Sequence, residues 1–365
     1  IRASQQIEIN LQQIPLNDEK TFQLLQQADT TGIFQLESDG MRQSLRDIKP
    51  THFLDIVAVN ALYRPGPMDF IPVYARRKHG QEEVVIPHPI LAPILNETFG
   101  IIVYQEQIMR IANVLAGFTI GEADLLRRAI SKKKREVLEE NEAKFILGAK
   151  RNGYDIHVAK EIYDLIVRFA DYGFAKSHAV AYSLISYQMA YLKAHYPVNF
   201  YAALLTNASG NQEKVNQILQ EAKIRGIDIL PPSIKKSGRH FKVENGKIRF
   251  SLSAVKGVPQ PLLKQLVELP KDQVHSIFDL AALLGGKLFN RKNIEPLVKA
   301  GALDDFGKDR AVLLATIDVA VKQAELMEQF SDGGVDLFGD NPYAFGKPKY
   351  VDANPIPQKE KLAFE

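Results

Sequence analysis

The chain has 365 residues, of which 45% are hydrophobic and 24% charged, and its formal net charge is +3. These are ordinary values for a globular protein, and the length favours two or three domains. Cysteine is absent, which excludes disulfides and thiolate metal sites and fits a cytoplasmic protein. No apolar run of transmembrane length and no signal-peptide pattern occurs, so we expect no membrane contact.

Apolar residues at helical spacing dominate the first 225 positions. The predicted helices cover residues 18–30, 41–48, 52–64, 71–79, 100–115, 123–130, 136–150, 156–170, 179–195, 199–206 and 213–225. Asp18, either Ser38 or Asp39, and the pair Thr119 and Glu122 are the expected N-terminal caps. The sequence of residues 79–89 predicts a loop that can include a short strand.

The pattern changes after residue 226. "HFKVENGKIRF" alternates apolar and polar residues around Asn245-Gly246, which predicts a β-hairpin. Short helices are predicted over residues 259–268, 276–284, 290–300 and 309–327, and a Gly-, Pro- and Asp-rich linker from about residue 331. The expected fold is mainly α, with several helical subdomains and one small β-hairpin. Both ends resemble the interior of a longer sequence, so we expect a fragment of a larger protein.

The densest basic stretch is "LLRRAISKKKREVLEE", at residues 125–140, on a predicted helix. Within nine residues it contains six cations and no acid: Arg127, Arg128, Lys132, Lys133, Lys134 and Arg135. A helix turns 100° per residue, so these charges surround much of its circumference. One interpretation is a solvated face balanced by the glutamates that follow. The other is a triphosphate site, which needs several such donors.

A second stretch, "DYGFAKSHAVAYSLISYQMAYLKAHYP", begins near a helix N-terminus. The candidate anion ligands there are Lys176, Ser177 and His178. Free N–H groups at a helix N-terminus attract anions, and these side chains add donors. Tyr182, Tyr187 and Tyr191 follow, and aromatic rings can stack on bases. Alternatively, Ser177 only caps the helix and the tyrosines belong to the core.

Two shorter motifs also suggest phosphate contacts. "ALYRPGPM" fixes a rigid turn directly after Arg64, although an exposed arginine at a helix end is equally compatible. "LSAVKGVPQPLLKQL" and "LFNRKNIEPLVKAGAL" resemble Gly-containing turns between short helices, which can offer backbone N–H groups to a DNA phosphate. The candidate DNA contacts are Lys256, Gly257, Lys264, Arg291 and Lys292.

Several catalytic patterns are missing from the sequence. There is no GxxxxGK[ST] loop and no HExxH motif, and the eight histidines lack metal-ligand spacing. No pair of aspartates suggests a two-metal carboxylate centre. We therefore assign no catalytic residue and no metal ligand in this chain.

Eight motifs follow one another along the chain: "TTGIFQLES", "ALYRPGPM", "RKHG", "FGIIVYQEQIMRIA", "ADLLRRAISKKK", "YGFAKSHAVAYSLISYQMAYLKAHYP", "ILPPSI" and "AVKGV". In this order they resemble the bacterial DNA polymerase III alpha subunits, the C-family replicative polymerases, over nearly the whole chain. The resemblance implies fingers at residues 1–232. It implies a C-terminal fingers part with the β-hairpin and a helix-hairpin-helix element at residues 233–310. A helix and flexible connector toward clamp-binding and OB domains follow at residues 311–365.

The resemblance also implies a function. The region would belong to a DNA-directed DNA polymerase and grip the incoming dNTP and primer-template DNA. In the family the catalytic aspartates, which hold Mg²⁺, lie in a palm that precedes this region, and no matching motif occurs here. We therefore expect the chain alone to be inactive and the Mg²⁺ ligands to lie outside it. The alternative is a non-catalytic DNA-binding or partner-docking module.

Residue by residue, the resemblance directs Arg127 and Arg128 toward the triphosphate, with Lys132, Lys133 and Lys134 nearby. It adds three residues to the same pocket: Lys176, Ser177 and His178. It also implies that Arg64 lies near the nucleotide. Positioned cations of this kind stabilise the charge that phosphoryl transfer develops.

The sequence departs from the family pattern at two places. "GVP" replaces "GVG" in the hairpin, so Pro259 offers one N–H donor fewer. "GGVDLFGD" resembles a sliding-clamp motif that retains Leu337 and Phe338 but has Gly334 in place of glutamine; an ordinary linker is the alternative. The expected partners are therefore DNA, dNTP, the sliding clamp and other replisome subunits.

Overall fold

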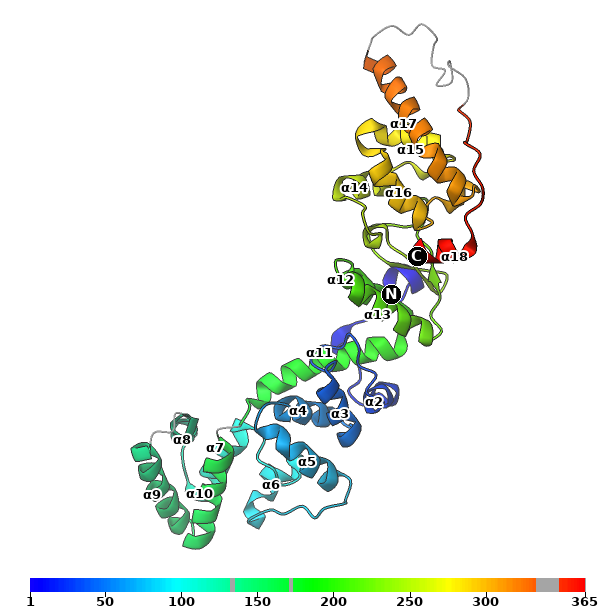
Figure 1. The fold of residues 1–365 in the computed structure, drawn as a ribbon. Coiled ribbons are helices and arrows are strands. Elements are labelled where there is room, and N and C mark those ends of the chain that lie inside the picture. Colours follow the sequence, from blue (N-terminus) through cyan, green and yellow to red (C-terminus); the bar gives the residue numbers. More distant parts are fainter. Residues whose placement is uncertain (132–134, 171–172, 333–347, 365) are drawn as a thin grey trace. The chain divides into compact units, whose positions relative to one another are not determined.

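The computed structural model describes residues 1–131, 135–170, 173–332 and 348–364. The fold is mainly α with a small β element, as predicted (Figure 1). The chain divides into two compact units. The first unit is Ile9–His195, and the second unit joins Ile1–Glu8 to Tyr196–Glu365. The predicted boundary near residue 232 lies inside the second unit, and the functional division at 232 and 310 stays a prediction.

The first unit is built mainly from helices in its described part. Its helices are α2 (Glu19–Gln26), α3 (Asp39–Ile48), α4 (Phe53–Leu62), α5 (Ile71–Lys78), α6 (Ala92–Leu95), α7 (Gln105–Ala116), α8 (Ile120–Ser131), α9 (Arg135–Arg151), α10 (Ile156–Ala170) and α11 (Lys176–His195). Asp18 caps α2 and Ser38 caps α3. The hydroxyl of Thr119 accepts from the Glu122 N–H, and the Glu122 carboxylate accepts from the Thr119 N–H. These caps confirm the predicted helix starts.

Helix α11 is anchored by polar contacts inside the first unit. The hydroxyl of the fully buried Tyr187 donates to the Pro15 carbonyl at 3.0 Å and accepts from the Asp18 N–H at 2.9 Å. The Lys193 side chain, 0% exposed, forms an ion pair of 3.1 Å with Asp29. Tyr187 therefore belongs to the core, and these contacts fix the helix whose first turn carries candidate ligands.

Two local expectations for the first unit were wrong. Helix α7 begins at Gln105 rather than Gly100, because residues 101–103 are buried and extended. They pair with a distant segment: the Phe174 N–H donates to the Val103 carbonyl at 3.1 Å. Residues 79–88, all of them described, form a loop without the short strand for which we saw room.

The second unit combines helices with a small sheet. Its helices are α1 (Arg2–Gln5), α12 (Pro197–Ala208), α13 (Gln212–Ile224), α14 (Gln260–Glu268), α15 (Ile277–Leu288), α16 (Arg291–Lys299), α17 (Arg310–Asp332) and α18 (Gln358–Phe364), and its strands are β1 (Ile229–Leu230), β2 (Lys242–Glu244) and β3 (Lys247–Arg249). Asn245 and Gly246 join β2 to β3 with positive φ angles of 51° and 74°, which confirms the hairpin. Strand β1, which pairs in parallel with β3, was not predicted.

Two hydrophobic clusters support the second unit. One packs α12 and α13 against the sheet, and the other gathers the buried faces of α14 to α17. The segment after residue 348 lies against the second cluster: the Tyr350 ring is 5.2 Å from that of Phe278, and Lys361 pairs with Asp309 at 2.7 Å. Among the residues that the structure describes, we find no helix with the length and apolarity needed to span a bilayer.

Candidate functional site

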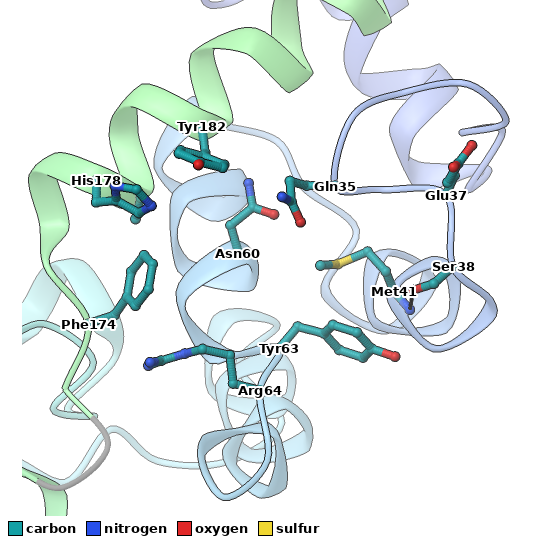
Figure 2. A pocket seen from close by; sticks show the side chains of 11 residues that line it. Gln35, Glu37, Ser38, Met41, Asn60, Tyr63, Arg64, Phe174, His178 and Tyr182 are labelled. Carbon is teal, nitrogen blue, oxygen red and sulfur yellow. Dashed lines mark hydrogen bonds between the residues drawn. The ribbon is translucent and has the colours of Figure 1, made fainter.

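A cleft of about 480 Å³ opens beside the first turns of α11 (Figure 2). Its polar and aromatic walls include Asn60, Tyr63, Arg64, Phe174, His178 and Tyr182. The close-up shows the ring of Phe174 just before α11 and the rings of His178 and Tyr182 on its first turns. Asn60 on α4 and Arg64 in the turn after α4 lie across from these rings. Two predicted ligands, Arg64 and His178, therefore share one cleft.

The cleft presents neighbouring aromatic rings that are tilted against one another, and an oriented cation. The His178 ring is 4.3 Å from that of Tyr182 and 5.4 Å from that of Phe174. The Arg64 guanidinium lies 4.4 Å from the Phe174 ring centre, and its Nε donates to the Ala61 carbonyl at 2.9 Å. Burial lowers the pKa of Arg64 from its ordinary value. Such a surface can stack a planar ligand and attract a negative one.

Asn60 gives this cleft an unused acceptor. Its Nδ2 donates to the Ser183 hydroxyl at 2.8 Å. Its Oδ1 is buried and has no hydrogen-bond partner among the described residues. Buried acceptors are normally satisfied, so a donor on a ligand in the cleft would complete this group. Sequence reasoning missed Asn60, since an asparagine inside an apolar helix carries no motif.

Arg127 and Arg128 share one carboxylate on α8. Asp124 Oδ1 accepts from Arg127 Nε at 2.9 Å and Nη2 at 2.7 Å, and Asp124 Oδ2 is 2.8 Å from Arg128 Nε. The Arg127 hydrogen bond is the main reason why the pKa of Asp124 lies below its usual range. The Arg127 side chain is 20% exposed and that of Arg128 is 61% exposed. Asp124 stands three and four positions before the arginines, a spacing that could have revealed it.

Lys176 begins α11, three residues earlier than predicted, and contacts two glutamates. Its Nζ lies 2.6 Å from a Glu97 carboxylate oxygen, and its backbone N–H donates to both oxygens of Glu106 at 2.9 and 3.0 Å. The predicted anion site at this helix N-terminus is thus occupied by Glu106. Ser177, the candidate cap, is exposed inside the first turn and does not line the cleft.

Gln105 connects these groups. Its Oε1 accepts from Arg127 Nη1 at 3.2 Å, and its Nε2 donates to the Gly173 carbonyl at 3.1 Å. Its backbone N–H donates to the Phe174 carbonyl at 3.0 Å. Arg127 is therefore linked through one side chain to the turn that leads into Lys176. The other candidate cations of the cluster, Lys132, Lys133 and Lys134, lie outside the described residues.

The candidate DNA contacts lie in the second unit. Gly257 adopts φ 93° in the turn before α14, and a Cβ there would lie 3.1 Å from Pro296 Cγ on α16. Lys256 beside it and Lys264 on α14 are both exposed. Pro259 is the N-cap of α14, so the predicted loss of a backbone donor falls at this helix start. The positive φ and the close approach to α16 both favour glycine in this turn.

The two basic residues at the start of α16 differ in environment. Arg291 Nη1 lies 3.0 Å from Asp318 Oδ2 on α17, and its Nε is 3.5 Å from Glu295. Lys292 is exposed. Arg291 therefore connects two helices, whereas Lys292 points its charge to solvent. The candidate clamp contacts Leu337 and Phe338 lie outside the described residues.

Metal ligands were not expected in this chain. Within the described residues, no group of three or more His, Asp or Glu side chains is arranged to hold a metal ion. The Mg²⁺ ligands expected elsewhere in the complete subunit stay a prediction.

The first unit is therefore mainly helical and carries oriented cations, and the second unit contains a tight turn between helices. Residues 1–153 match the bacterial DNA polymerase III alpha subunit finger domain, and residues 226–313 match a helix-hairpin-helix motif. The chain belongs to the family of bacterial DNA polymerase III alpha subunits, as the sequence motifs predicted.

Relatives of the chain carry that subunit's name. The chain is 51% identical, over 100% of its length, to DNA polymerase III subunit alpha of Bacillus subtilis (strain 168). It is 52% identical over 98% of its length to that of Halalkalibacterium halodurans, and 50% over 98% to that of Staphylococcus aureus (strain N315). The chain covers 33%, 32% and 34% of these relatives, so it spans about a third of their length.

Proposed function

We propose that this region serves a replicative DNA-directed DNA polymerase by gripping the incoming dNTP with its first unit and primer-template DNA with its second. The observation that carries the proposal is the contact network around Gln105, which joins Arg127 to the turn before Lys176. In this proposal the catalytic carboxylates and their Mg²⁺ belong to another part of the complete subunit, and the chain alone does not polymerise DNA.

The first unit supplies two kinds of interaction that a dNTP needs. Arg127, Arg128 and Lys176 are donors for phosphate oxygens, and charge-assisted hydrogen bonds to phosphate are among the strongest available. Their role in the reaction is electrostatic, because phosphoryl transfer places charge on the phosphates and on the leaving pyrophosphate. The rings of His178 and Tyr182 offer a face on which the base can stack.

Primer-extension kinetics of the complete subunit test the triphosphate role. We expect Arg127→Ala to lower kcat/KM for dNTP by about a hundredfold, the usual effect of removing one donor that stabilises transition-state charge. Arg151→Ala, an exposed arginine at the end of α9, is the matched control and leaves the kinetics unchanged. Unchanged KM and kcat in Arg127→Ala would refute the assigned role.

The second unit supports DNA binding without sequence readout. The turn at Gly257 packs on α16 and carries the exposed Lys256, and Lys264 and Lys292 are exposed on α14 and α16. Exposed lysines attract phosphate through counterion release, so duplex affinity should fall steeply as salt rises. A salt titration of duplex binding by this chain tests the proposal, and no affinity at low salt would contradict it. Contacts with the sliding clamp and other replisome subunits, and a cytoplasmic location, stay predictions.

A further inference from the structure

The oxygen and the nitrogen of the Gln105 side-chain amide contact separate parts of the chain. The acceptor Oε1 faces Arg127 on α8, and the donor Nε2 faces the Gly173 carbonyl before α11. The contact with Gly173 is also steric: a Cβ on Gly173 would lie 3.2 Å from Gln105 Cγ. A side chain there would need the glutamine to shift by a few tenths of an ångström, so the turn packs closely against Gln105.

The next residue of α7 holds the other side of the same site. Glu106 accepts from the Lys176 N–H at 2.9 and 3.0 Å. The first two residues of α7 therefore contact both predicted phosphate-binding elements, Arg127 on α8 and the first turn of α11. Because α7 also packs against α8, a shift of either element relative to α7 would break one of these hydrogen bonds.

We propose that Gln105 is a positioning residue for triphosphate binding. It fixes the Arg127 guanidinium relative to the turn that carries Phe174 and Lys176, so that the cations of α8 and α11 form one receptor. The proposal rests on the proposed function. An amide suits this place because its oxygen accepts from the guanidinium while its N–H donates to the carbonyl. A carboxylate offers no donor, and a thioether has neither an N–H group nor a carbonyl oxygen.

A double-mutant cycle in the complete subunit tests the proposal. Gln105→Met keeps the length of the side chain and removes both hydrogen bonds. We expect it to raise KM for dNTP by about tenfold with a smaller change in kcat, since a misplaced ligand about 1 Å away costs up to a hundredfold. The hydrogen bonds of Gln105 to Arg127 and to the Gly173 carbonyl form a bridge between α8 and the turn before α11. In Arg127→Ala this bridge has no cation to hold, so adding Gln105→Met should change kcat/KM by less than about twofold.

Two controls separate positioning from general stability. In the double variant of Gln105→Met and Arg128→Ala, the two fold-changes in kcat/KM should multiply. The described contact of Arg128 is with Asp124 and not with Gln105, so the two residues should act independently. Gln188→Met removes a comparable hydrogen bond, from Nε2 to the Leu11 carbonyl at 3.1 Å, on the same long helix. It should leave KM unchanged. If the fold-changes in kcat/KM caused by Gln105→Met and Arg127→Ala multiply in the double variant, the proposal for Gln105 is overturned. The proposed function would still stand in that case, because it depends on the effect of Arg127→Ala alone.

Gln105→Glu tests the second half of the bridge. The carboxylate still accepts from Arg127 but cannot donate to the Gly173 carbonyl. We expect KM to stay raised, as in Gln105→Met. A wild-type KM in Gln105→Glu shows that holding Arg127 is sufficient and that the link to the α11 turn has no role. If Arg127→Ala alone has no effect, the proposed function fails, and that outcome is distinct from failure of the bridge.

Discussion

The candidate phosphate ligands of the two units differ in what holds them. In the first unit, Arg127 and Lys176 each contact a carboxylate, at 2.7 and 2.6 Å. In the second unit, Lys256 in the turn at Gly257, Lys264 on α14 and Lys292 on α16 are exposed. A guanidinium held by a carboxylate and an amide keeps one orientation, whereas a solvated ammonium samples many. The first arrangement suits a ligand of fixed shape, and the second suits a polyanion bound at many registers.

Orientation in the first unit has an electrostatic cost. Asp124 and Glu97 reduce the attraction that their cation partners exert on a triphosphate, because opposite charges at contact distance largely cancel at longer range. A bound phosphate must share or replace these carboxylates. The candidate ligands of the first unit are therefore held in fixed orientations, but their charge is partly neutralised. The exposed lysines of the second unit keep their charge but have no fixed orientation.

The largest expected effect concerns the anchor of α11. Lys193→Met removes the buried cation that lies 3.1 Å from Asp29, and removing one partner of a buried ion pair costs about 3–5 kcal/mol. The matched surface pair is Lys247 with Asp228, at 2.9 Å with side chains 47% and 66% exposed; Lys247→Met should cost no more than about 1 kcal/mol. Urea unfolding measures both. Equal losses would show that burial does not distinguish these cations.

The next effect concerns the turn at Gly257. Gly257→Ala forces a side chain into a left-handed conformation and against Pro296, so we expect a loss of about 1–2 kcal/mol in unfolding free energy. Duplex binding should weaken with it, because the turn carries Lys256. Gly238→Ala is the control: a Cβ there meets nothing within 4 Å. Thermal unfolding and fluorescence anisotropy with duplex DNA measure the two effects. Wild-type stability in Gly257→Ala would show that the turn does not require glycine.

A smaller effect separates two neighbours on α16. Lys292→Gln should reduce the slope of log affinity for duplex DNA against log salt by about 0.9, the value for one phosphate contact. Arg291→Gln should change the slope less, because Asp318 and Glu295 already engage the guanidinium. Salt titrations of both variants decide the matter. Equal slope changes would remove the distinction between paired and solvated cations in this unit.

Local features of this fold could be predicted from the sequence, since their determinants lie within a few residues. Asp18, Ser38 and the pair Thr119 and Glu122 cap the helices that follow them, and Asn245 begins the hairpin turn. Strand β1 escaped prediction because two residues carry no detectable alternation. The start of α7 was misplaced because the extended segment before it pairs with Phe174, some seventy positions away.

The candidate site was predictable only in part. The resemblance named Arg64, Arg127 and Lys176, but the groups that hold them were missed. Glu97 and Glu106 are 79 and 70 positions from Lys176, and Gln105 is 22 positions from Arg127. Tertiary packing brings these partners together, and periodicity carries no information about it. Asp124 is the exception, because helical spacing alone places it beside the arginines.

The smallest effect tests the acids of the first unit through pH. The hydrogen bond from Lys144, followed by those from Thr119, lowers the pKa of Glu122 to about 2, whereas an unfolded chain has a glutamate pKa of about 4.3. The unfolded chain then binds the proton first as pH falls, so the stabilisation from Glu122 is complete above that value and disappears as pH falls toward 2. Thermal unfolding of wild type and Glu122→Gln between pH 6 and pH 2 measures it.

We expect the difference in Tm between wild type and Glu122→Gln to be largest at pH 6 and to vanish near pH 2. Glu83→Gln, which changes an exposed carboxylate of the 79–88 loop, is the control for general charge effects. A Tm difference that stays constant across this range would mean that Glu122 stabilises α8 through packing rather than charge. The ion pair of Glu122 with Lys144 would then not be what stabilises the start of α8, and the contrast between the units would still rest on Asp124 and Glu97.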